Sequence, residues 1–148
     1  MKGKKVLVTG AAGLVGSKLI DELINEGALV TVVFNKTTCN DGGVYGIKAD
    51  LTIEENCFRV CKGQDIVIHL AASTSGAGRI IESPLSHIRS NLMMHFTMLE
   101  AAYEAGAEKF VFLSSSTGYP VSNLPMKEED YFTGDPHDTY FGAGWSKG

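Results

Sequence analysis

The chain has 148 residues, of which 44% are hydrophobic and 20% charged, a balance typical of one soluble globular domain with a sizeable core. The formal net charge is −4, and the sequence pattern contains no face rich in Lys or Arg. The basic surface typical of nucleic-acid-binding proteins is therefore excluded. No apolar run is long enough to cross a membrane or to form a signal-peptide core, and three cysteines without metal-ligand spacing fit a reduced, cytoplasmic setting and no metal site.

The first elements are a strand, a glycine turn and a helix. Val6–Thr9 form a run typical of a buried strand, and apolar residues recur at helical spacing over Leu14–Glu26. Gly10, Gly13 and Gly16 lie between the two patterns, spaced three apart. Glycine lets a turn close and lets backbone N–H groups approach an anion, and a helix N-terminus adds the positive end of its dipole. The stretch predicts a phosphate-binding turn; the alternative is a tight turn that binds nothing.

The later elements alternate in the same way. Further strands are predicted at residues 28–34, 44–49, 65–70 and 109–113. Thr52 is expected to cap a short helix, with Glu55 completing a capping box. A long helix is predicted to open at Ser83-Pro84 and to end at Gly106. Strands separated by helices predict an α/β fold with a parallel, doubly wound sheet, that is, a Rossmann-like domain.

Small or polar residues follow four of the predicted strands. Because parallel strands bring their carboxyl ends to one edge, these residues should line one rim, where ligands bind in such sheets. They are Thr9-Gly10, Asn35-Lys36, Ala71-Ala72-Ser73 and Ser114-Ser115-Ser116. Cys57 and Cys61, four residues apart on the short helix, are expected to be small core side chains.

The C-terminal part of the sequence differs in character. From Thr117 to Asp138 the periodicity is lost and three prolines appear, which indicates a surface excursion over the rim. The sequence reaches Gly148 a few residues into a pattern typical of a new helix. We therefore interpret residues 1–148 as one incomplete dinucleotide-binding domain, the N-terminal part of a longer protein whose C-terminal substrate-binding part is absent.

Several motifs occur in one order along the chain: TGAAGLVG (9–16), Asp50-Leu51, HLAA (69–72), Asn91 and FVFLSSSTGYP (110–120). Together they resemble the extended short-chain dehydrogenase/reductases, and among these the NAD-dependent epimerase/dehydratase family that acts on nucleotide sugars. The run SPLSHIRSNLMMHFTMLEAA (83–102) is most similar to the GDP-fucose synthase group of GDP-sugar epimerase/reductases.

The resemblance implies NAD or NADP as the cofactor and assigns residues to it. The glycines would hold the pyrophosphate, Asp50 and Leu51 would border the adenine, and Ala71 and Ala72 would leave room for the middle of the cofactor. The complete implied set is Gly10, Ala12, Gly13, Leu14, Val15, Gly16, Asn35, Lys36, Asp50, Leu51, Leu70, Ala71, Ala72, Asn91 and Ser114. Asn91 is expected to bond backbone near the site. His69 is interpreted as a hydrogen-bonded core histidine without a catalytic role.

For catalysis the family uses a Ser or Thr that bonds the substrate oxygen, a Tyr that shuttles its proton, and a Lys four residues after the Tyr. The resemblance implies Ser115, Tyr140 and Lys147 for these roles. However, Gly144 stands four residues after Tyr140, and Ala143 stands four residues before Lys147. On one helix Tyr140 and Lys147 would share a face but lie about 10 Å apart along the axis. Either the helix start is irregular at its glycines, or the chemistry differs from the family norm.

The choice between NAD and NADP depends on the end of the second strand, where NAD-binding proteins place a carboxylate that accepts both ribose hydroxyls. Here the position is Asn35, followed by Lys36. Asparagine does not repel a 2′-phosphate and lysine can pair with one, so the sequence slightly favours NADP. The alternative is a solvated turn into which Asp41 swings.

The predicted function is reversible oxidation of a hydroxyl on a nucleotide sugar, followed by epimerisation, dehydration or reduction. One alternative keeps the fold and the cofactor but acts on a non-sugar alcohol or ketone. Another is a regulatory or scaffold protein that binds NAD(P) without turnover. We expect no nucleic-acid or membrane partner and a possible homodimer, and we expect Ser115 and Tyr140 to face the same cleft as the glycine turn.

Overall fold

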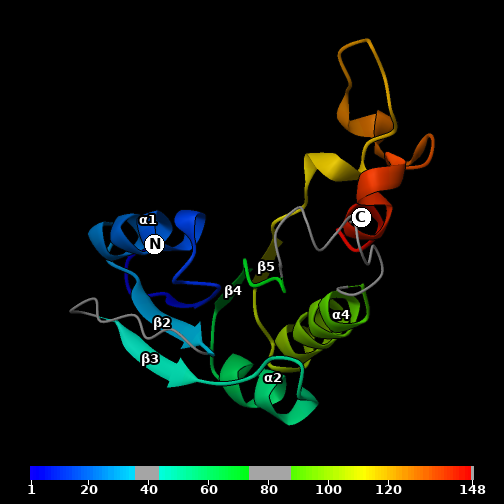
Figure 1. Cartoon of the computed structure of the whole chain (residues 1–148). Helices are drawn as coiled ribbons and strands as arrows, with labels where there is room; N and C mark the ends of the chain where they lie inside the picture. The colour runs from blue at the N-terminus through cyan, green and yellow to red at the C-terminus, as the bar shows by residue number, and fades with distance from the viewer. Residues whose placement is uncertain (36–43, 74–87, 148) are drawn as a thin grey trace. The chain divides into compact units, whose positions relative to one another are not determined.

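The computed structural model of the chain describes residues 1–35, 44–73 and 88–147 (Figure 1). Its residues cluster into two compact units. The first consists of Met1–Ala72 and Met93–Phe112, and the second of Ser73–Leu92 and Leu113–Gly148. The first unit contains the whole sheet, and the second contains the segments that follow the last strand.

The first unit is built on a five-stranded parallel sheet with the order β3-β2-β1-β4-β5. The strands are β1 (Lys5–Thr9), β2 (Leu29–Phe34), β3 (Tyr45–Lys48), β4 (Ile66–His69) and β5 (Lys109–Phe112). All five strands predicted from the sequence are therefore confirmed, and so is their parallel direction. The register pairs Thr9 with Val33 and with His69, and His69 with Phe112, so the carboxyl ends of β1, β2, β4 and β5 share one edge.

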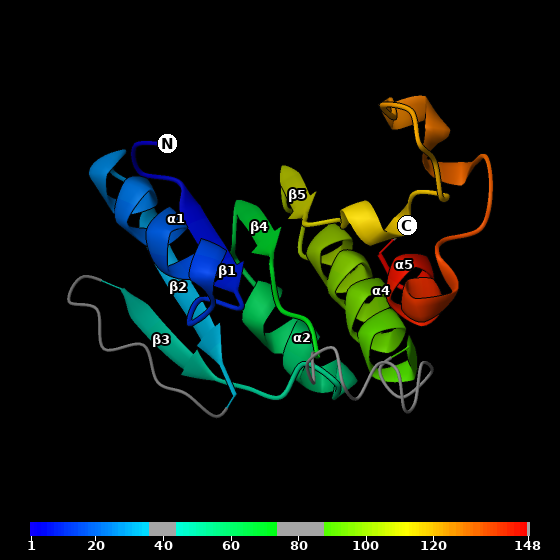
Figure 2. The ribbon, with the colours of Figure 1, turned by 45° about the horizontal axis from the view of Figure 1, so that its top comes forward.

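Side chains from the two faces of the sheet enter two separate hydrophobic clusters, because successive strand residues point to opposite faces. On one face, Val6 and Val8 pack with Ile20 and Leu23 of α1 (Leu14–Asn25). On the other, Leu7 packs with residues of α2 (Glu54–Cys61) and α4 (Ile88–Glu104). Helices thus cover both faces, as Figure 2 shows for α1 and α2, and the doubly wound α/β architecture is confirmed.

The start of α2 differs from the prediction. The helix begins at Glu54, its N-cap is Ile53, and no side chain caps it. Thr52 lies one residue too early: its backbone N–H and its hydroxyl both donate to Asp50 Oδ1, at 3.0 and 2.7 Å. The predicted capping box of Thr52 and Glu55 is therefore wrong, because the Asp50 carboxylate forms a local turn with Thr52 before the helix starts.

The remaining helix and the cysteines follow the predictions where the structure describes them. Helix α4 spans Ile88–Glu104 and is followed by Gly106 at φ +73°; the predicted start at Ser83-Pro84 lies outside the described residues. Cys57 and Cys61 are free thiols in the core. Burial raises the pKa of Cys57 to about 11 and that of Cys61 to about 12, so both stay protonated. Cys39 lies outside the described residues.

The second unit contains short helical turns joined by irregular chain. Three 3₁₀ turns, Ser116–Gly118, Glu128–Phe132 and Asp138–Tyr140, precede the five-residue helix α5 (Phe141–Trp145). An antiparallel bridge between Pro120 and Pro136 closes the base of the excursion. In the ranges that the structure describes, no helix has the length and apolar character needed to span a membrane.

Candidate functional site

The glycine turn between β1 and α1 is shaped by close backbone contacts. Gly10 has a φ of +69°, which favours glycine, and a Cβ there would lie 2.7 Å from the Leu70 carbonyl carbon. At Gly16 a Cβ would lie 2.4 Å from the Gly10 carbonyl oxygen. Gly13 donates its N–H to that same oxygen at 3.0 Å and forms the N-cap of α1. Gly10 and Gly16 are therefore required for the turn to close against the end of β4.

Gly13 has a different role from the other two glycines. Its backbone is extended, with φ −79° and ψ 170°, so any residue can adopt its conformation. The first turn of α1 has no acidic residue, and no side chain caps it. Leu14 is 90% exposed and Val15 51% exposed at this helix start. The N-terminus of α1 therefore presents its backbone dipole and an exposed apolar surface, with no carboxylate to repel an anion.

Asn91 near the start of α4 bonds the backbone that follows β4, as the sequence predicted. Its side chain is buried, its Oδ1 accepts from the Ser73 N–H at 2.7 Å, and its Nδ2 donates to the Ser73 carbonyl at 3.2 Å. This two-point contact fixes both polar groups of one peptide position directly after Ala71-Ala72. Asn91 is thus a bracing residue for the segment in which the sequence placed the middle of the cofactor.

His69 is a buried core histidine with hydrogen-bond partners, which confirms this part of its interpretation from the sequence. Its Nδ1 lies 2.7 Å from Thr9 Oγ1, and its Nε2 lies 2.9 Å from Nδ1 of His95. Sequence reasoning missed His95. The available signal was its position on α4 four residues after Asn91, a spacing that places two side chains on one side of a helix.

The residues assigned to the adenine and to the ribose lie at the ends of β3 and β2. Asp50 is partly buried and accepts two hydrogen bonds from Thr52. Leu51 is buried in the core cluster on the α2 side of the sheet. Asn35 is exposed and directly follows β2, whereas Lys36 lies outside the described residues. The adenine and ribose assignments stay predictions.

In the second unit the structure brings Ser114 and Lys147 together. Ser114 Oγ lies 2.8 Å from the Lys147 carbonyl oxygen, and Lys147 Nζ donates to the Leu113 carbonyl at 3.3 Å. Ser115 Oγ pairs with Thr117 Oγ1 at 2.9 Å and caps the following 3₁₀ turn. Ser114 and the predicted lysine are thus in direct contact, whereas the Ser115 side chain bonds within its own 3₁₀ turn. The shared cleft of Ser115 and Tyr140 with the glycine turn stays a prediction.

Tyr140 and Lys147 do not share one helix, which corrects the geometry drawn from their spacing. Tyr140 is the N-cap of α5, Ser146 is the C-cap, and Lys147 follows that cap. A separate 3₁₀ turn ends at Tyr140, so the chain is irregular before Phe141, whereas the glycines at which the sequence placed the irregularity, Gly142 and Gly144, lie within α5. Tyr140 is 40% exposed, and its ring lies 6.1 Å from the His137 ring.

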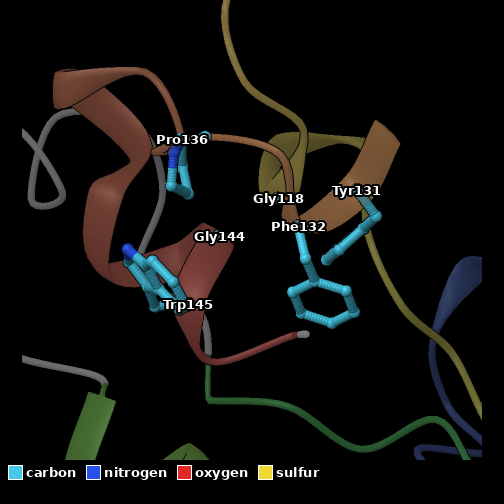
Figure 3. Close-up of a pocket in the computed structure, with 7 residues that line it drawn as sticks. Gly118, Tyr131, Phe132, Pro136, Gly144 and Trp145 are labelled. Atoms are coloured by element: carbon cyan, nitrogen blue, oxygen red, sulfur yellow. The ribbon is translucent and has the colours of Figure 1, made fainter. Parts of the chain in front are cut away.

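The position where the family spacing from Tyr140 expects a lysine is sterically closed. A Cβ at Gly144 would lie 2.6 Å from the Thr117 carbonyl oxygen and 2.7 Å from Pro136. Gly144 lines a small pocket together with aromatic residues of the excursion, as Figure 3 shows. The other lining residues are Gly118, Tyr131, Phe132, Gly134, Pro136 and Trp145.

Tyr131 is a polar group of this region that sequence reasoning missed. Its hydroxyl lies 3.2 Å from Ser114 Oγ and donates to the Ser115 carbonyl at 3.3 Å. A Cβ at Gly118 would overlap the Tyr131 hydroxyl, so glycine is needed for this packing. No periodicity surrounds Tyr131 in the sequence, and its contacts depend on how the excursion folds back on itself.

Burial lowers the pKa of Lys147 from its ordinary value of 10.5. Between the lowered pKa and 10.5 Lys147 therefore binds more protons in the unfolded chain than in the folded chain, so its contribution makes the free energy of unfolding rise with pH there. We expect Lys147→Met to remove this rise, whereas substitution of the exposed Lys62 by methionine should leave it unchanged. Urea unfolding measured from neutral pH to above 10.5 checks the prediction, and an identical pH dependence in Lys147→Met and the parent would contradict it.

Comparison with known proteins shows which family the chain is similar to. Residues 6–142 match the model of the NAD dependent epimerase/dehydratase family. The chain is 32% identical over 145 residues to GDP-mannose 3,5-epimerase 1 of Oryza sativa subsp. japonica, covering 92% of this chain and 38% of the relative. It is also 32% identical over 137 residues to GDP-L-fucose synthase of Sinorhizobium fredii, covering 90% of this chain and 40% of the relative.

The chain is also similar to solved structures of such enzymes. The UDP-glucose 4-epimerase of Thermus thermophilus, in complex with NAD, superposes with a TM-score of 0.77 at 29% identity, covering 97% of this chain and 47% of that structure. The chain spans about two fifths of the length of the two curated relatives. On this basis the chain belongs to the NAD-dependent epimerase/dehydratase family.

Proposed function

We propose that the chain binds the pyrophosphate of NAD(P) at the glycine turn and forms the cofactor-binding part of a nucleotide-sugar epimerase, dehydratase or reductase. The observation that carries the proposal is the open N-terminus of α1 behind Gly13. Gly10 and Gly16 close the turn, while Gly13 leaves the space in front of the helix free of a side chain. The residues present thus fit a dinucleotide phosphate group.

The remaining assigned residues support the same site. Leu14 and Val15 present apolar surface beside the turn, and Asn91 braces the peptide that follows Ala71-Ala72. The nicotinamide, when bound, would supply and accept the electron pair for oxidation of an alcohol. The relatives are named for GDP-mannose, GDP-L-fucose and UDP-glucose, which supports a nucleotide sugar as the substrate class.

Under this proposal Ser115 bonds the substrate oxygen and Lys147 contributes a cation next to the serines. The proton acceptor proposed from the resemblance is Tyr140. Its separation from Lys147 by the whole of α5 favours a second candidate function, a protein that binds NAD(P) without turnover. Ala143, four residues before Lys147, carries no hydroxyl that could take the place of Tyr140 in the family spacing.

Calorimetric titration of the folded chain with NAD and NADP tests the cofactor site, because binding needs no substrate. Saturable binding with one site per chain is the expected result. Addition of a panel of GDP- and UDP-sugars to the loaded chain, with the sugar products separated by chromatography, distinguishes the two candidate functions, because epimerisation and dehydration return the cofactor to its starting state. Binding without any sugar product favours the second, and absence of binding to either cofactor contradicts the proposal.

We propose NADP as the preferred cofactor, because Asn35 directly after β2 is exposed and uncharged where a carboxylate would repel a 2′-phosphate. We expect Asn35→Asp to shift the preference toward NAD by about tenfold, or about 1.4 kcal/mol. Competitive titration of both cofactors against the parent and Asn35→Asp measures this shift. A parent that already prefers NAD tenfold or more, or a variant with an unchanged preference, would contradict it.

We also propose a homodimer and a cytoplasmic setting. Helix α4 carries a row of exposed apolar side chains at helical spacing, a feature typical of interaction surfaces. They are Met93, Phe96, Leu99 and Tyr103. Light scattering of the parent and of Phe96→Lys tests the dimer, since a charge in that row should produce monomers. The cytoplasmic setting is supported by the reduced thiols of Cys57 and Cys61.

A further inference from the structure

A chain of buried polar contacts connects the glycine turn to α4. The Ala71 N–H donates to Thr9 Oγ1 at 3.1 Å. Thr9 Oγ1 lies 2.7 Å from His69 Nδ1, and His69 Nε2 lies 2.9 Å from His95 Nδ1. Thr9 and His69 are fully buried. All four residues belong to the unit that contains the sheet, and none is among the residues assigned a catalytic role.

The donor in each of these hydrogen bonds follows from which atoms carry a proton. Among the described residues, the Thr9 hydroxyl has only two hydrogen-bond partners, the Ala71 amide and the His69 ring. The amide donates to Thr9, so the buried hydroxyl proton has only His69 Nδ1 as an acceptor. His69 must then carry its own proton on Nε2 and donate it to His95 Nδ1. Each bond thus fixes the direction of the next.

The peptide at one end of this chain is the one against which the glycine turn closes. A Cβ at Gly10 would lie 2.7 Å from the Leu70 carbonyl carbon and 2.8 Å from the Ala71 nitrogen. A displacement of the Ala71 amide would therefore move the surface on which the turn rests. His95, at the other end, also packs edge-on against Phe112, with ring centroids 4.7 Å apart.

We propose that His95 is a positioning residue for the cofactor site: by accepting the hydrogen bond from His69 Nε2, it keeps the hydrogen bonds of His69 and Thr9 in the arrangement that fixes the Ala71 peptide beside the glycine turn. The inference rests on the proposed function in that the site is taken to bind NAD(P). The hydrogen bonds from Ala71 through Thr9 and His69 to His95, here called the relay, form without a cofactor. A residue of α4, remote in sequence from the turn, thus helps to keep the turn in the conformation that binds its ligand.

Two substitutions separate hydrogen bonding from packing at His95. Phenylalanine keeps a ring against Phe112 but removes the acceptor at the Nδ1 position. The His69 Nε2–H then loses its His95 acceptor, or the ring moves its proton to Nδ1 and no longer accepts the Thr9 hydroxyl proton. Asparagine loses the ring but keeps an acceptor oxygen close to the former Nδ1 position. A packing role predicts that phenylalanine is tolerated better, and the relay predicts the reverse.

The first measurement uses the ¹⁵N-labelled parent chain without cofactor. Long-range ¹H–¹⁵N spectra of the histidine rings, at a pH where free histidine is neutral, report which ring nitrogen carries the proton. The expected result is His69 protonated on Nε2. Protonation on Nδ1 would overturn the relay, whatever happens to cofactor binding.

The second measurement compares His95→Phe, His95→Asn and Glu100→Ala, an exposed position on the same helix. We expect His95→Phe to accelerate hydrogen exchange at the Ala71 amide by about tenfold and to weaken NAD(P) binding by about fivefold. His95→Asn should stay within about twofold of the parent in both, as should Glu100→Ala. An asparagine variant no better than the phenylalanine variant would overturn the proposal. If the parent binds neither cofactor, the proposed function fails, while the ring protonation and the Ala71 exchange still decide the relay.

Discussion

Gly13→Val is expected to reduce NAD(P) affinity at least about tenfold while the chain stays folded. The backbone at Gly13 is extended, so valine can adopt its conformation, and the added Cβ would meet only the Gly10 carbonyl oxygen, at 3.1 Å. That oxygen can shift by a few tenths of an ångström, at a cost of about 1–2 kcal/mol of folding free energy. The branched side chain would, however, occupy the space in front of α1 where a pyrophosphate must approach the backbone N–H groups.

Calorimetry on the folded variant measures the affinity, and circular dichroism with urea unfolding checks that the fold survives. Lys18→Ala provides a matched control, because Lys18 is exposed on the same helix but lies outside the turn. Cofactor affinity equal to that of the parent in a folded Gly13→Val chain would show that the turn is structural only.

Gly16→Val should have the opposite effect, a large loss of stability that removes binding along with the fold. A Cβ at this position would overlap the Gly10 carbonyl oxygen and lie 2.9 Å from the Ala11 Cα, so relief of the clash needs a shift much larger than the one that Gly13→Val requires, and such a shift would open the turn. Gly16 is also buried in the first turn of α1, which packs against the sheet. We expect the free energy of unfolding to fall by about 3 kcal/mol or more.

The measurement is urea unfolding of Gly16→Val beside Gly13→Val and Lys18→Ala. A Gly16→Val chain as stable as the Gly13→Val chain would mean that α1 can withdraw from the turn at little cost, and the close-packed turn described above would be wrong. The pair of valine variants thus separates the glycine that leaves room for a ligand from a glycine that lets the turn close.

Much of the sheet could be predicted because its information is local. Runs such as ALVTVVF and DIVIHL are apolar on both faces, and the helices between them repeat their apolar residues at helical spacing. The prediction that the residues after these strands lie at one edge of the sheet followed from the parallel direction of the strands alone. The start of α2 could not be predicted in the same way, because Asp50 and Thr52 are both good capping residues and only their mutual contact decides which of them turns the chain.

The candidate site was predictable where its chemistry is encoded by glycine spacing and not where it depends on packing between distant residues. Asn91 was found through its place in the order of motifs that carries the resemblance to the family. His95 and Tyr131 were missed, because their hydrogen-bond partners, His69 and Ser114, lie far from them in the sequence. The spacing of Tyr140 and Lys147 misled for a related reason: it assumes one continuous helix, and the chain breaks at Tyr140 instead.

The contact of Gly10 with the Leu70–Ala71 peptide also has a consequence for folding order. The turn closes against a strand end whose residues lie about sixty positions later, as the Thr9–His69 pair illustrates with a separation of 60. Such non-local closure is slow to form, because loop entropy must be lost before the contact stabilises the chain. During synthesis, β1 and α1 therefore emerge well before β4 can complete the turn, and the nascent chain acquires the closed geometry of the glycine turn only after β4 has left the ribosome and docked beside β1.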